Sequence, residues 1–176
     1  MIIFETKRLI VRRYELTDAD NFFSLNGDEE VMRYIRPAKS REESDAFLKY
    51  NIAFANELPL YGRWAVEEKD SNDFVGSFAV IPVDNSTNMQ LGYALLPKAW
   101  GKGYATELTL EGLKYVFSKT DLQTIYAYTE GPNIPSQKVL LKCGFKHLQN
   151  KIEGGKEVCE FVFAKAEFQA LQVVSC

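Results

Sequence analysis

Histidine and cysteine, the side chains that most often build structural metal sites, are scarce in this chain. Its 176 residues include one histidine, His147, and three cysteines, Cys143, Cys159 and Cys176. An odd number of cysteines with no Cys-x-x-Cys spacing argues against a zinc site and against a disulfide framework. We therefore expect no metal, and we interpret Cys143, on the apolar face of a predicted helix, as a core residue.

The chain also has no excess of positive charge and no long apolar run. Its net charge is −3, whereas a protein that binds nucleic acid presents a basic face. The N-terminal stretch MIIFETKRLIVRR lacks the apolar segment of a secretory signal or a transmembrane helix. We expect no nucleic-acid partner, no membrane association and a cytoplasmic location.

The composition is that of an ordinary globular protein. Apolar residues make up 46% of the chain, aromatic residues 13% and charged residues 26%, which is enough to bury a core. No repeat, low-complexity segment or linker divides the chain, so we predict one domain over residues 1–176. The sequence leaves the oligomeric state open between monomer and homodimer.

Hydrophobic periodicity predicts strands and helices in an order typical of a mixed α/β fold. The predicted strands are 8–14, 64–68, 74–83, 91–96, 122–129, a strand that starts at 145, and 158–166. The predicted helices start at the caps Thr17 and Ser40, at residues 28, 104 and 134. This order combines antiparallel hairpins with one parallel crossover.

Residues 91–117, LGYALLPKAWGKGYATELTLEGLKYVF, read as a strand, a glycine turn and a helix. The first N–H groups of a helix have no partner within it and attract anions. Gly101 and Gly103 allow close approach of the backbone, and Lys102 adds a positive charge. An ordinary strand-to-helix turn is the alternative. The Walker pattern is absent, and no glycine at 106 completes a dinucleotide fingerprint, so a nucleotide-binding function is disfavoured.

The same stretch resembles motif A of the GNAT N-acetyltransferases, Arg/Gln-x-x-Gly-x-Gly/Ala after a strand. Trp100, Gly103 and Ala105 fill that pattern, with Trp in the Arg/Gln position. The blocks ETKRLIVRRYELTDAD, DEEVMRYI, FVGSFAV and NIPSQKVLLKCGF also resemble segments of the RimJ/RimL-like branch in the same order. The chain is therefore identified as a member of this superfamily.

The resemblance implies a GNAT acyltransferase fold of the α+β (mixed α/β) type. Its central, twisted, mostly antiparallel sheet is splayed between the fourth and fifth strands and flanked by helices. It also implies acetyl-CoA as co-substrate, whose pantetheine arm lies along the splayed strand like an added strand. The implied donor-binding residues are Tyr93, Ala94 and Leu95 through their backbone, Trp100, Gly101, Lys102, Gly103, Tyr104, Ala105 and Thr106 around the pyrophosphate, and Asn133 and Ser136.

The implied chemistry is direct attack of a neutral amine on the thioester carbonyl, with an N–H near Leu95 stabilising the oxyanion. The sequence departs from the family where Gln90 replaces a glutamate base and where Leu140 replaces a tyrosine acid. Ser136 is the remaining hydroxyl for protonating the thiolate, and Gln90 can hold a water or the substrate. Alternatively, Ser136 bonds backbone at a helix start and Gln90 is a solvated strand residue.

Several other polar residues have simpler interpretations than catalysis. His147 is expected at the surface or in a strand, and Glu107 is expected to support the helix start. Glu130, at the end of the 122–129 strand, is a minor candidate for the base. Arg33, Tyr34 and Arg36 border the acceptor side by family analogy, although an ordinary surface position is the leading interpretation.

Three functions remain from the sequence. The first is acetylation of a primary amine, either a protein N-terminus of the ribosomal-protein type or a small molecule such as a polyamine, an amino sugar or an antibiotic. The second is a coenzyme A-binding module without chemistry, suggested by Gln90 and Leu140. The third, a nucleotide-type phosphate-binding protein, is remote because its motifs are missing.

Overall fold

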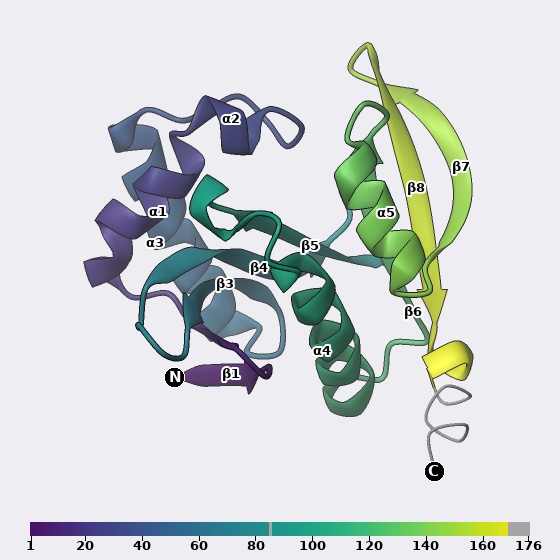
Figure 1. Cartoon of the computed structure of the whole chain (residues 1–176), viewed down its shortest axis with the longest axis horizontal. Coiled ribbons are helices and arrows are strands. Elements are labelled where there is room, and N and C mark those ends of the chain that lie inside the picture. Colours follow the sequence, from purple (N-terminus) through teal and green to yellow (C-terminus); the bar gives the residue numbers. More distant parts are fainter. Residues whose placement is uncertain (85, 169–176) are drawn as a thin grey trace.

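The computed structural model describes residues 1–84 and 86–168, so Cys176 lies outside the described residues. The strands are β1 (Ile2–Glu5), β2 (Leu9–Arg13), β3 (Gly62–Glu68), β4 (Phe74–Pro82), β5 (Met89–Leu95), β6 (Thr124–Glu130), β7 (Lys146–Glu153) and β8 (Lys156–Ala164). The helices are α1 (Ala19–Asn26), α2 (Glu29–Met32), α3 (Arg41–Glu57), α4 (Tyr104–Lys119) and α5 (Ile134–Lys142), with 3₁₀ turns at Leu16–Asp18 and Pro97–Ala99. Figure 1 shows their arrangement.

The strands form one mixed sheet in the order β1-β2-β3-β4-β5-β6-β8-β7. All neighbours are antiparallel except β5 and β6, which are parallel and pair at a single position, Gln90 with Tyr126. Beyond that position the two strands separate. The expected splay between the fourth and fifth predicted strands is thus confirmed, since those are β5 and β6.

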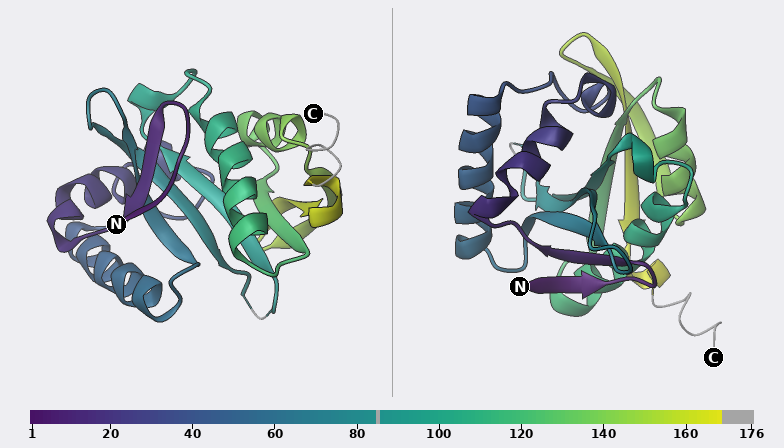
Figure 2. Two further views of the ribbon diagram at one scale, coloured as in Figure 1. Left: turned by 90° about the horizontal axis from the view of Figure 1, so that it is seen from below. Right: turned by 60° about the vertical axis from the view of Figure 1, so that its left-hand side comes forward.

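Helices cover both faces of the sheet (Figure 2). One apolar cluster joins the sheet to α4 and α5 and includes Trp64, Phe78 and Leu108. A second joins the opposite face to α1, α2 and α3 and includes Phe22 and Leu48. The pattern follows from strand alternation, because successive side chains point to opposite faces.

Helix α4 approaches the sheet closely because it carries a glycine at its point of contact. A Cβ added at Gly112 would lie 2.2 Å from Phe78 Cζ, which is a clash. Phe78 itself stacks on Trp64, with ring centroids 6.3 Å apart. This packing fixes α4, and with it the turn that precedes the helix.

The predicted helix start at Ser40 is confirmed. Its side chain accepts a hydrogen bond from the Glu43 N–H, and the Glu43 carboxylate accepts one from the Ser40 N–H, which is a capping box. The predicted cap at Thr17 is wrong. Glu15 and Asp18 form the reciprocal pair instead, and Thr17 lies inside a 3₁₀ turn.

Strand β1 was not predicted. Its sequence, IIFE, is short, and it lies at the edge of the sheet, where it pairs with β2 alone. The strand predicted to start at residue 145 extends to Glu153 as β7, and six of its eight residues from Lys146 are polar or charged. Both are edge strands, which have too few buried positions for a clear hydrophobic pattern.

Candidate active site

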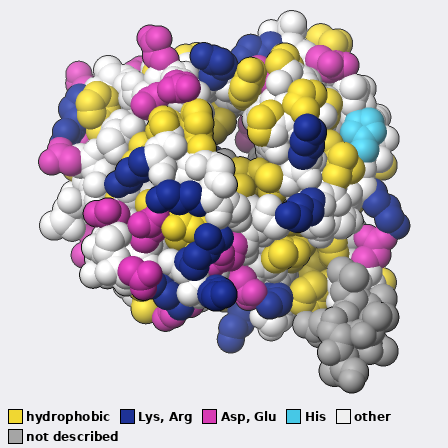
Figure 3. Space-filling view, viewed as in Figure 1, with side chains coloured by type: hydrophobic (Ala, Val, Ile, Leu, Met, Phe, Trp, Pro, Cys, Tyr) yellow, Lys and Arg dark blue, Asp and Glu magenta, His cyan; other side chains and the backbone are white. Residues whose placement is uncertain are grey.

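A cavity of about 1100 Å³ lies at the splay between β5 and β6. Its walls come chiefly from β5 with the turn that follows it, β6 with the start of α5, and the segment from Glu30 to Pro37 after α1. Residues of α1, β3, β4 and the turn between β7 and β8 complete the lining. On the molecular surface the opening is a hollow rimmed by hydrophobic side chains, between the α2 side and the α5 side (Figure 3). The predicted site residues can be compared with this cavity one group at a time.

The glycine turn presents a row of free backbone donors to the cavity. Gly101 and Gly103 adopt left-handed φ angles of +73° and +79°, a conformation that favours glycine. The helical hydrogen bonds of α4 begin at Glu107, whose N–H donates to Gly103 O at 3.2 Å. Within the described residues, the N–H groups of residues 101–106 have no acceptor. The turn therefore fits an anion such as a pyrophosphate.

The two long side chains of the turn behave differently from each other. Trp100 lines the cavity, and its Nε1 donates to Leu95 O at 2.7 Å, which ties the turn to the end of β5. Lys102 does not line the cavity, and its ammonium lies 3.0 Å from Glu68 Oε1. That hydrogen bond to Glu68 raises the pKa of Lys102. The cavity thus lends no support to a phosphate contact by Lys102, which stays a prediction.

The register of β5 decides which amide groups face the splay. Antiparallel residues alternate between bonding their partner strand and pointing away from it. The Leu96 N–H donates to Val75 O at 2.9 Å, so Leu96 and Ala94 direct their amide groups at β4. Tyr93 and Leu95 direct theirs toward β6. The register therefore supports Tyr93 and Leu95 as backbone partners of a donor, whereas the prediction for Ala94 is wrong, because its amide groups are turned away.

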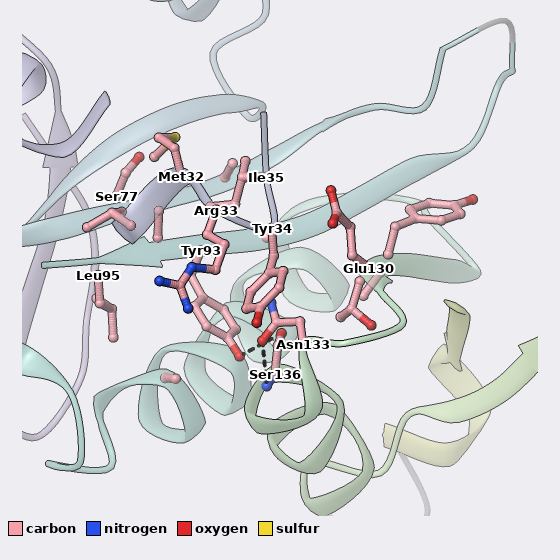
Figure 4. A pocket seen from close by; sticks show the side chains of 18 of the residues that line it. Met32, Arg33, Tyr34, Ile35, Ser77, Tyr93, Leu95, Glu130, Asn133 and Ser136 are labelled. Atoms are coloured by element: carbon pink, nitrogen blue, oxygen red, sulfur yellow. Dashed lines mark hydrogen bonds between the residues drawn. The ribbon is translucent and has the colours of Figure 1, made fainter. Parts of the chain in front are cut away.

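A pair of hydroxyl groups meets inside the cavity. Tyr93 Oη and Ser136 Oγ are 3.2 Å apart, and Asn133 Oδ1 accepts the Ser136 N–H at 3.3 Å, capping α5 (Figure 4). Burial raises the pKa of Tyr93, and the hydrogen bond with Ser136 acts in the opposite direction. Both groups are thus protonated at neutral pH and can donate. The sequence pointed to Ser136 and Asn133, but it assigned Tyr93 only a backbone role.

Gln90 and Glu130 also line the cavity. Gln90 Nε2 makes a long hydrogen bond of 3.4 Å to Pro82 O, which leaves Oε1 as a free acceptor. Glu130 forms an ion pair with Lys156, and only 17% of its side chain is exposed. Figure 4 shows Arg33 and Tyr34 pointing into the cavity from the segment after α2, opposite Ser136. Arg33 is exposed and Tyr34 half-buried, and both line the cavity, so their place on the acceptor side stays a prediction that this position supports.

Three further candidates lie outside the cavity. His147 is exposed, bonds Asn150 and packs on Phe161. Cys143 is buried, and burial raises its pKa to about 11, so it is no nucleophile near neutral pH. Glu107 binds Thr6 and Arg8, which confirms its expected role at the start of α4.

No group of three or more His, Cys, Asp or Glu side chains among the described residues is placed to hold a metal ion. Within 1–84 and 86–168, no helix combines the length and the apolar character needed to cross a bilayer.

Comparison with known proteins supplies the family. The acetyltransferase (GNAT) domain family matches residues 8–146. The uncharacterized N-acetyltransferase p20 of Bacillus licheniformis is 31% identical over 145 residues, which is 80% of each chain. A GNAT-family acetyltransferase structure from Bacillus anthracis superposes with a TM-score of 0.82 at 24% identity, over 94% of this chain and 99% of that one.

Two more distant structures are complexes that contain coenzyme A. One is the spermidine N-acetyltransferase of Vibrio cholerae with CoA and spermine, at 21% identity and a TM-score of 0.76, covering 92% of this chain and 98% of that one. The other is RimL, a ribosomal L7/L12 alpha-N-protein acetyltransferase in complex with coenzyme A, at 16% and 0.77, covering 93% and 98%. At these identities the likeness shows the fold alone.

Proposed function

The chain belongs to the acetyltransferase (GNAT) family and is an acetyl-CoA-dependent acyltransferase, and we propose that it acetylates a primary amine by direct attack within a ternary complex. The observation that carries this proposal is the joining of two features in one cavity. These are the free N–H groups of the 101–106 turn and the hydroxyl pair of Tyr93 and Ser136. The first can hold a donor phosphate, and the second can serve the leaving group.

We infer the donor site from backbone N–H and C=O groups that have no hydrogen-bond partner among the described residues. The pyrophosphate would lie against the N–H groups of residues 101–106, where the dipole of α4 favours an anion. The amides of the pantetheine arm would extend along β5 at Tyr93, whose backbone groups face the splay, and at the Leu95 N–H, since Leu95 O already accepts from Trp100 Nε1. In this arrangement the thioester would lie near the hydroxyl of Ser136, on the opposite wall of the splay. Acetyl-CoA, when bound, supplies the acetyl group as an activated thioester.

The transfer forms a C–N bond and breaks a C–S bond. The Leu95 N–H is free to stabilise the oxyanion on the carbonyl. The Ser136 hydroxyl gives its proton to the thiolate, and the proton that water takes from the amine returns to Ser136 through the adjacent Tyr93 hydroxyl, so that both hydroxyls end protonated. The amine loses one proton to water, and Gln90 Oε1 can hold that water or the amine itself. Neither Cys143 nor Cys159 lines the cavity, which favours direct attack over a covalent acyl-enzyme.

The acceptor can be of two kinds. The RimJ/RimL-like blocks and the structural likeness to RimL support a protein N-terminal amine of the ribosomal-protein type. The likeness to the spermidine enzyme supports a small-molecule amine, such as a polyamine, an amino sugar or an antibiotic. We place the enzyme in the cytoplasm as a single catalytic domain, since Cys143 and Cys159 are buried free thiols that suit a reducing compartment.

Thiol release from acetyl-CoA tests the proposal against a panel of polyamines, amino sugars, amino acids and ribosomal-protein N-terminal peptides. We expect turnover with one class and a matching acetylated product by mass spectrometry. Donor binding by calorimetry is measured in parallel. Intact donor binding with no product from any class would contradict the proposed transfer.

A coenzyme A-binding module without chemistry is the second candidate, because an amide stands at Gln90 and a buried leucine at Leu140. The Gln90→Glu variant separates the two. A transferase that releases its proton through water should change less than about tenfold, since general-base catalysis contributes about 10²-fold or more where it operates. A gain well beyond that, from a near-silent wild type, would favour the module.

A further inference from the structure

Two arginines line the part of the cavity on the α1–α3 side of the sheet. Arg63 projects from β3 on the face opposite Trp64, and Arg36 follows α2. Their Cζ atoms lie 5.7 Å and 4.9 Å from the Phe47 ring centroid. We call Arg36 and Arg63 the arginine pair. Both side chains are only partly exposed, and both line the same cavity.

The arginine pair has no carboxylate partner within residues 1–84 and 86–168. Arg8, Arg12 and Arg41 each form an ion pair with Asp or Glu, whereas no ion pair involves Arg36 or Arg63 there. Among the described residues, the one side chain that accepts a hydrogen bond from Arg36 is a neutral amide, Asn26 Oδ1, at 2.6 Å from its Nη2. Its Nε is buried with no hydrogen-bond partner.

Burial and mutual repulsion make this arrangement unfavourable for the cations. Burial lowers the pKa of Arg36 to about 10, and the positive charge of Arg63 adds to the effect. Burial likewise lowers the pKa of Arg63. Guanidinium groups stay charged in proteins near neutral pH. Taking a cation out of water without a counter-ion costs folding free energy. Groups perturbed in this way are found most often at functional sites, where a ligand can supply the opposite charge.

The wall beside the arginine pair holds further unused donors. Ser77 lines the cavity from β4 and is 5% exposed. The Tyr14 hydroxyl is buried close to Ser77 Oγ but does not line the cavity, and neither hydroxyl makes a hydrogen bond of good geometry in the described chain. In Figure 4, Ser77 lies on the wall away from Ser136. The unpaired donors thus gather on the side of the sheet opposite α5, away from the proposed thioester site.

We propose that the amine acceptor carries a carboxylate, and that this carboxylate binds the arginine pair with Ser77 as an additional donor. The inference rests on the proposed function, because the bound molecule is taken to be the acceptor. A guanidinium matches a carboxylate in a two-point contact. A polyamine has no carboxylate, and its remote end is cationic. A peptide N-terminus would place a neutral amide, not a carboxylate, at the arginine pair.

The register limits the size of the acceptor. Arg63 pairs with Ala79, which pairs with Gly92 on β5, so Arg63 and the splayed strand are two strand spacings apart, or about 10 Å. An amine at β5 and a carboxylate at the arginine pair must fit within that span. The acceptor class is therefore a compact amino acid in which both groups lie on one small molecule.

The arginine pair is placed to avoid the donor phosphates. Arg63 lies on the sheet face opposite Trp64, whereas the turn that holds the free N–H groups leads into α4, which packs on the Trp64 face. A variant of the arginine pair should consequently affect the acceptor and not the donor. This difference in effect provides the test.

The experiment compares lysine, lysinamide and cadaverine, which share an amine and differ in the carboxylate. With coenzyme A present, lysine should raise the melting temperature of the wild type, while lysinamide and cadaverine should not. Arg63→Gln should remove the lysine effect and lower kcat/KM for lysine by about 10- to 100-fold, the usual range for a lost charged hydrogen bond. Coenzyme A affinity by calorimetry should stay unchanged.

Lys39→Gln is the matched control. It removes a cation that lies 5.2 Å from the same Phe47 ring but does not line the cavity, so the preference for lysine should persist. Arg63→Lys, which keeps the charge, should retain part of the lysine effect. Without ligand, Arg63→Gln should melt no lower than the wild type, because it removes an unpaired buried charge. A structural role for Arg63 predicts a lower melting temperature instead.

The outcomes separate this inference from the proposed function. Equal stabilisation by all three compounds, or weakened coenzyme A binding in Arg63→Gln, would overturn the carboxylate site. A stronger effect from phosphoethanolamine than from lysine would also overturn it, in favour of a phosphate. Lysine stabilisation that depends on Arg63, without any thiol release, would leave the carboxylate site standing and remove the proposed transfer.

Discussion

At the scale of single residues, the Tyr93–Ser136 hydroxyl pair is the part of the cavity that we propose takes part in proton transfer. Ser136 lies in the first turn of α5, where Asn133 caps its N–H. Its hydroxyl is therefore held by the helix and by Tyr93 at 3.2 Å. A hydroxyl fixed in this way can protonate a leaving group without reorganising.

Ser136→Ala should lower kcat by about 100-fold, the lower range for loss of a general acid, with donor affinity changed by less than about threefold. Thiol release and calorimetry measure the two quantities. Ser118→Ala is the control, since that serine bonds Tyr115 O on α4 and lies outside the cavity. If donor affinity falls as much as kcat, Ser136 is a donor contact and not the acid.

Gly103→Val should weaken donor binding by about 100-fold, because a side chain and a strained φ would displace several N–H groups, worth about 1 kcal/mol each. Gly155→Val is the matched control. Gly155 has φ +80°, close to the +79° of Gly103, and open space around it, but it does not line the cavity. Equal donor affinity in wild type and Gly103→Val by calorimetry would refute the phosphate turn.

A site residue can be predicted from sequence when the residues that define its role lie close to it in the chain. Gly101, Gly103 and Asn133 belong to short motifs with a local geometric cause. The hydroxyl of Tyr93 was missed because its partner is 43 positions away. Arg63 carried a usable signal that was overlooked: a cation between Gly62 and Trp64 in a strand whose alternate residues are apolar.

At the scale of elements, the β1–β2 hairpin is fastened to the first turn of α4 by one carboxylate. Glu107 accepts from the Thr6 hydroxyl and from the N–H and Nε of Arg8. Burial acts to raise the pKa of Glu107, but the hydrogen bonds from Thr6 and Arg8 outweigh it and lower the pKa below 4.5. The hairpin thereby supports the helix whose first N–H groups face the cavity.

Glu107→Gln should lower the free energy of unfolding by about 2 kcal/mol at neutral pH, as for a lost charged hydrogen bond. Because the folded pKa lies below 4.5, this contribution is present above pH 4.5 and lost as the pH falls through the folded value. Urea unfolding of both proteins across pH should therefore show the difference shrinking under acid. Glu111→Gln, which removes a surface pair with Lys114, should cost under about 1 kcal/mol. A constant difference down to low pH would contradict this role.

Elements with strong periodicity were predicted well, and weak edge strands were not. Helix α3 begins where predicted, directly after Ser40, because Ser40 and Glu43 mark its start and its apolar residues follow helical spacing. Strand β1 has only four residues and two partly buried positions, Ile3 and Phe4. Its place is set by pairing with β2 and packing on α4, which no window of local sequence contains.

At the scale of the whole molecule, the splay between β5 and β6 opens a cavity that is lined by residues from both faces of the sheet. The single β5–β6 pair at Gln90 and Tyr126 closes one end of the gap, and the cavity occupies the rest. The hydroxyl pair lies on the α5 side and the arginine pair on the α1–α3 side. A donor and an acceptor can thus meet from opposite faces, which is what direct transfer requires.

The splay itself could not be derived from periodicity. The sequence order implied one parallel crossover, but the gap between β5 and β6 was expected only through resemblance to the GNAT family. Hydrophobic alternation reports which side chains are buried and not which backbone groups lack a partner. The acceptor side could not be predicted for the same reason. Arg36, Arg63 and Ser77 come from the segment after α2, from β3 and from β4, and they line one cavity only in the folded chain.

Direct transfer makes a specific demand on initial-rate kinetics, and this is the measurement we would make first once an acceptor is identified. Rates of thiol release are recorded over a matrix of acetyl-CoA and amine concentrations. Direct transfer predicts double-reciprocal lines that intersect, and no thiol burst without amine, because donor and acceptor must be bound together. Parallel lines with an amine-independent burst would indicate an acyl-enzyme and would contradict direct attack in the splayed cavity.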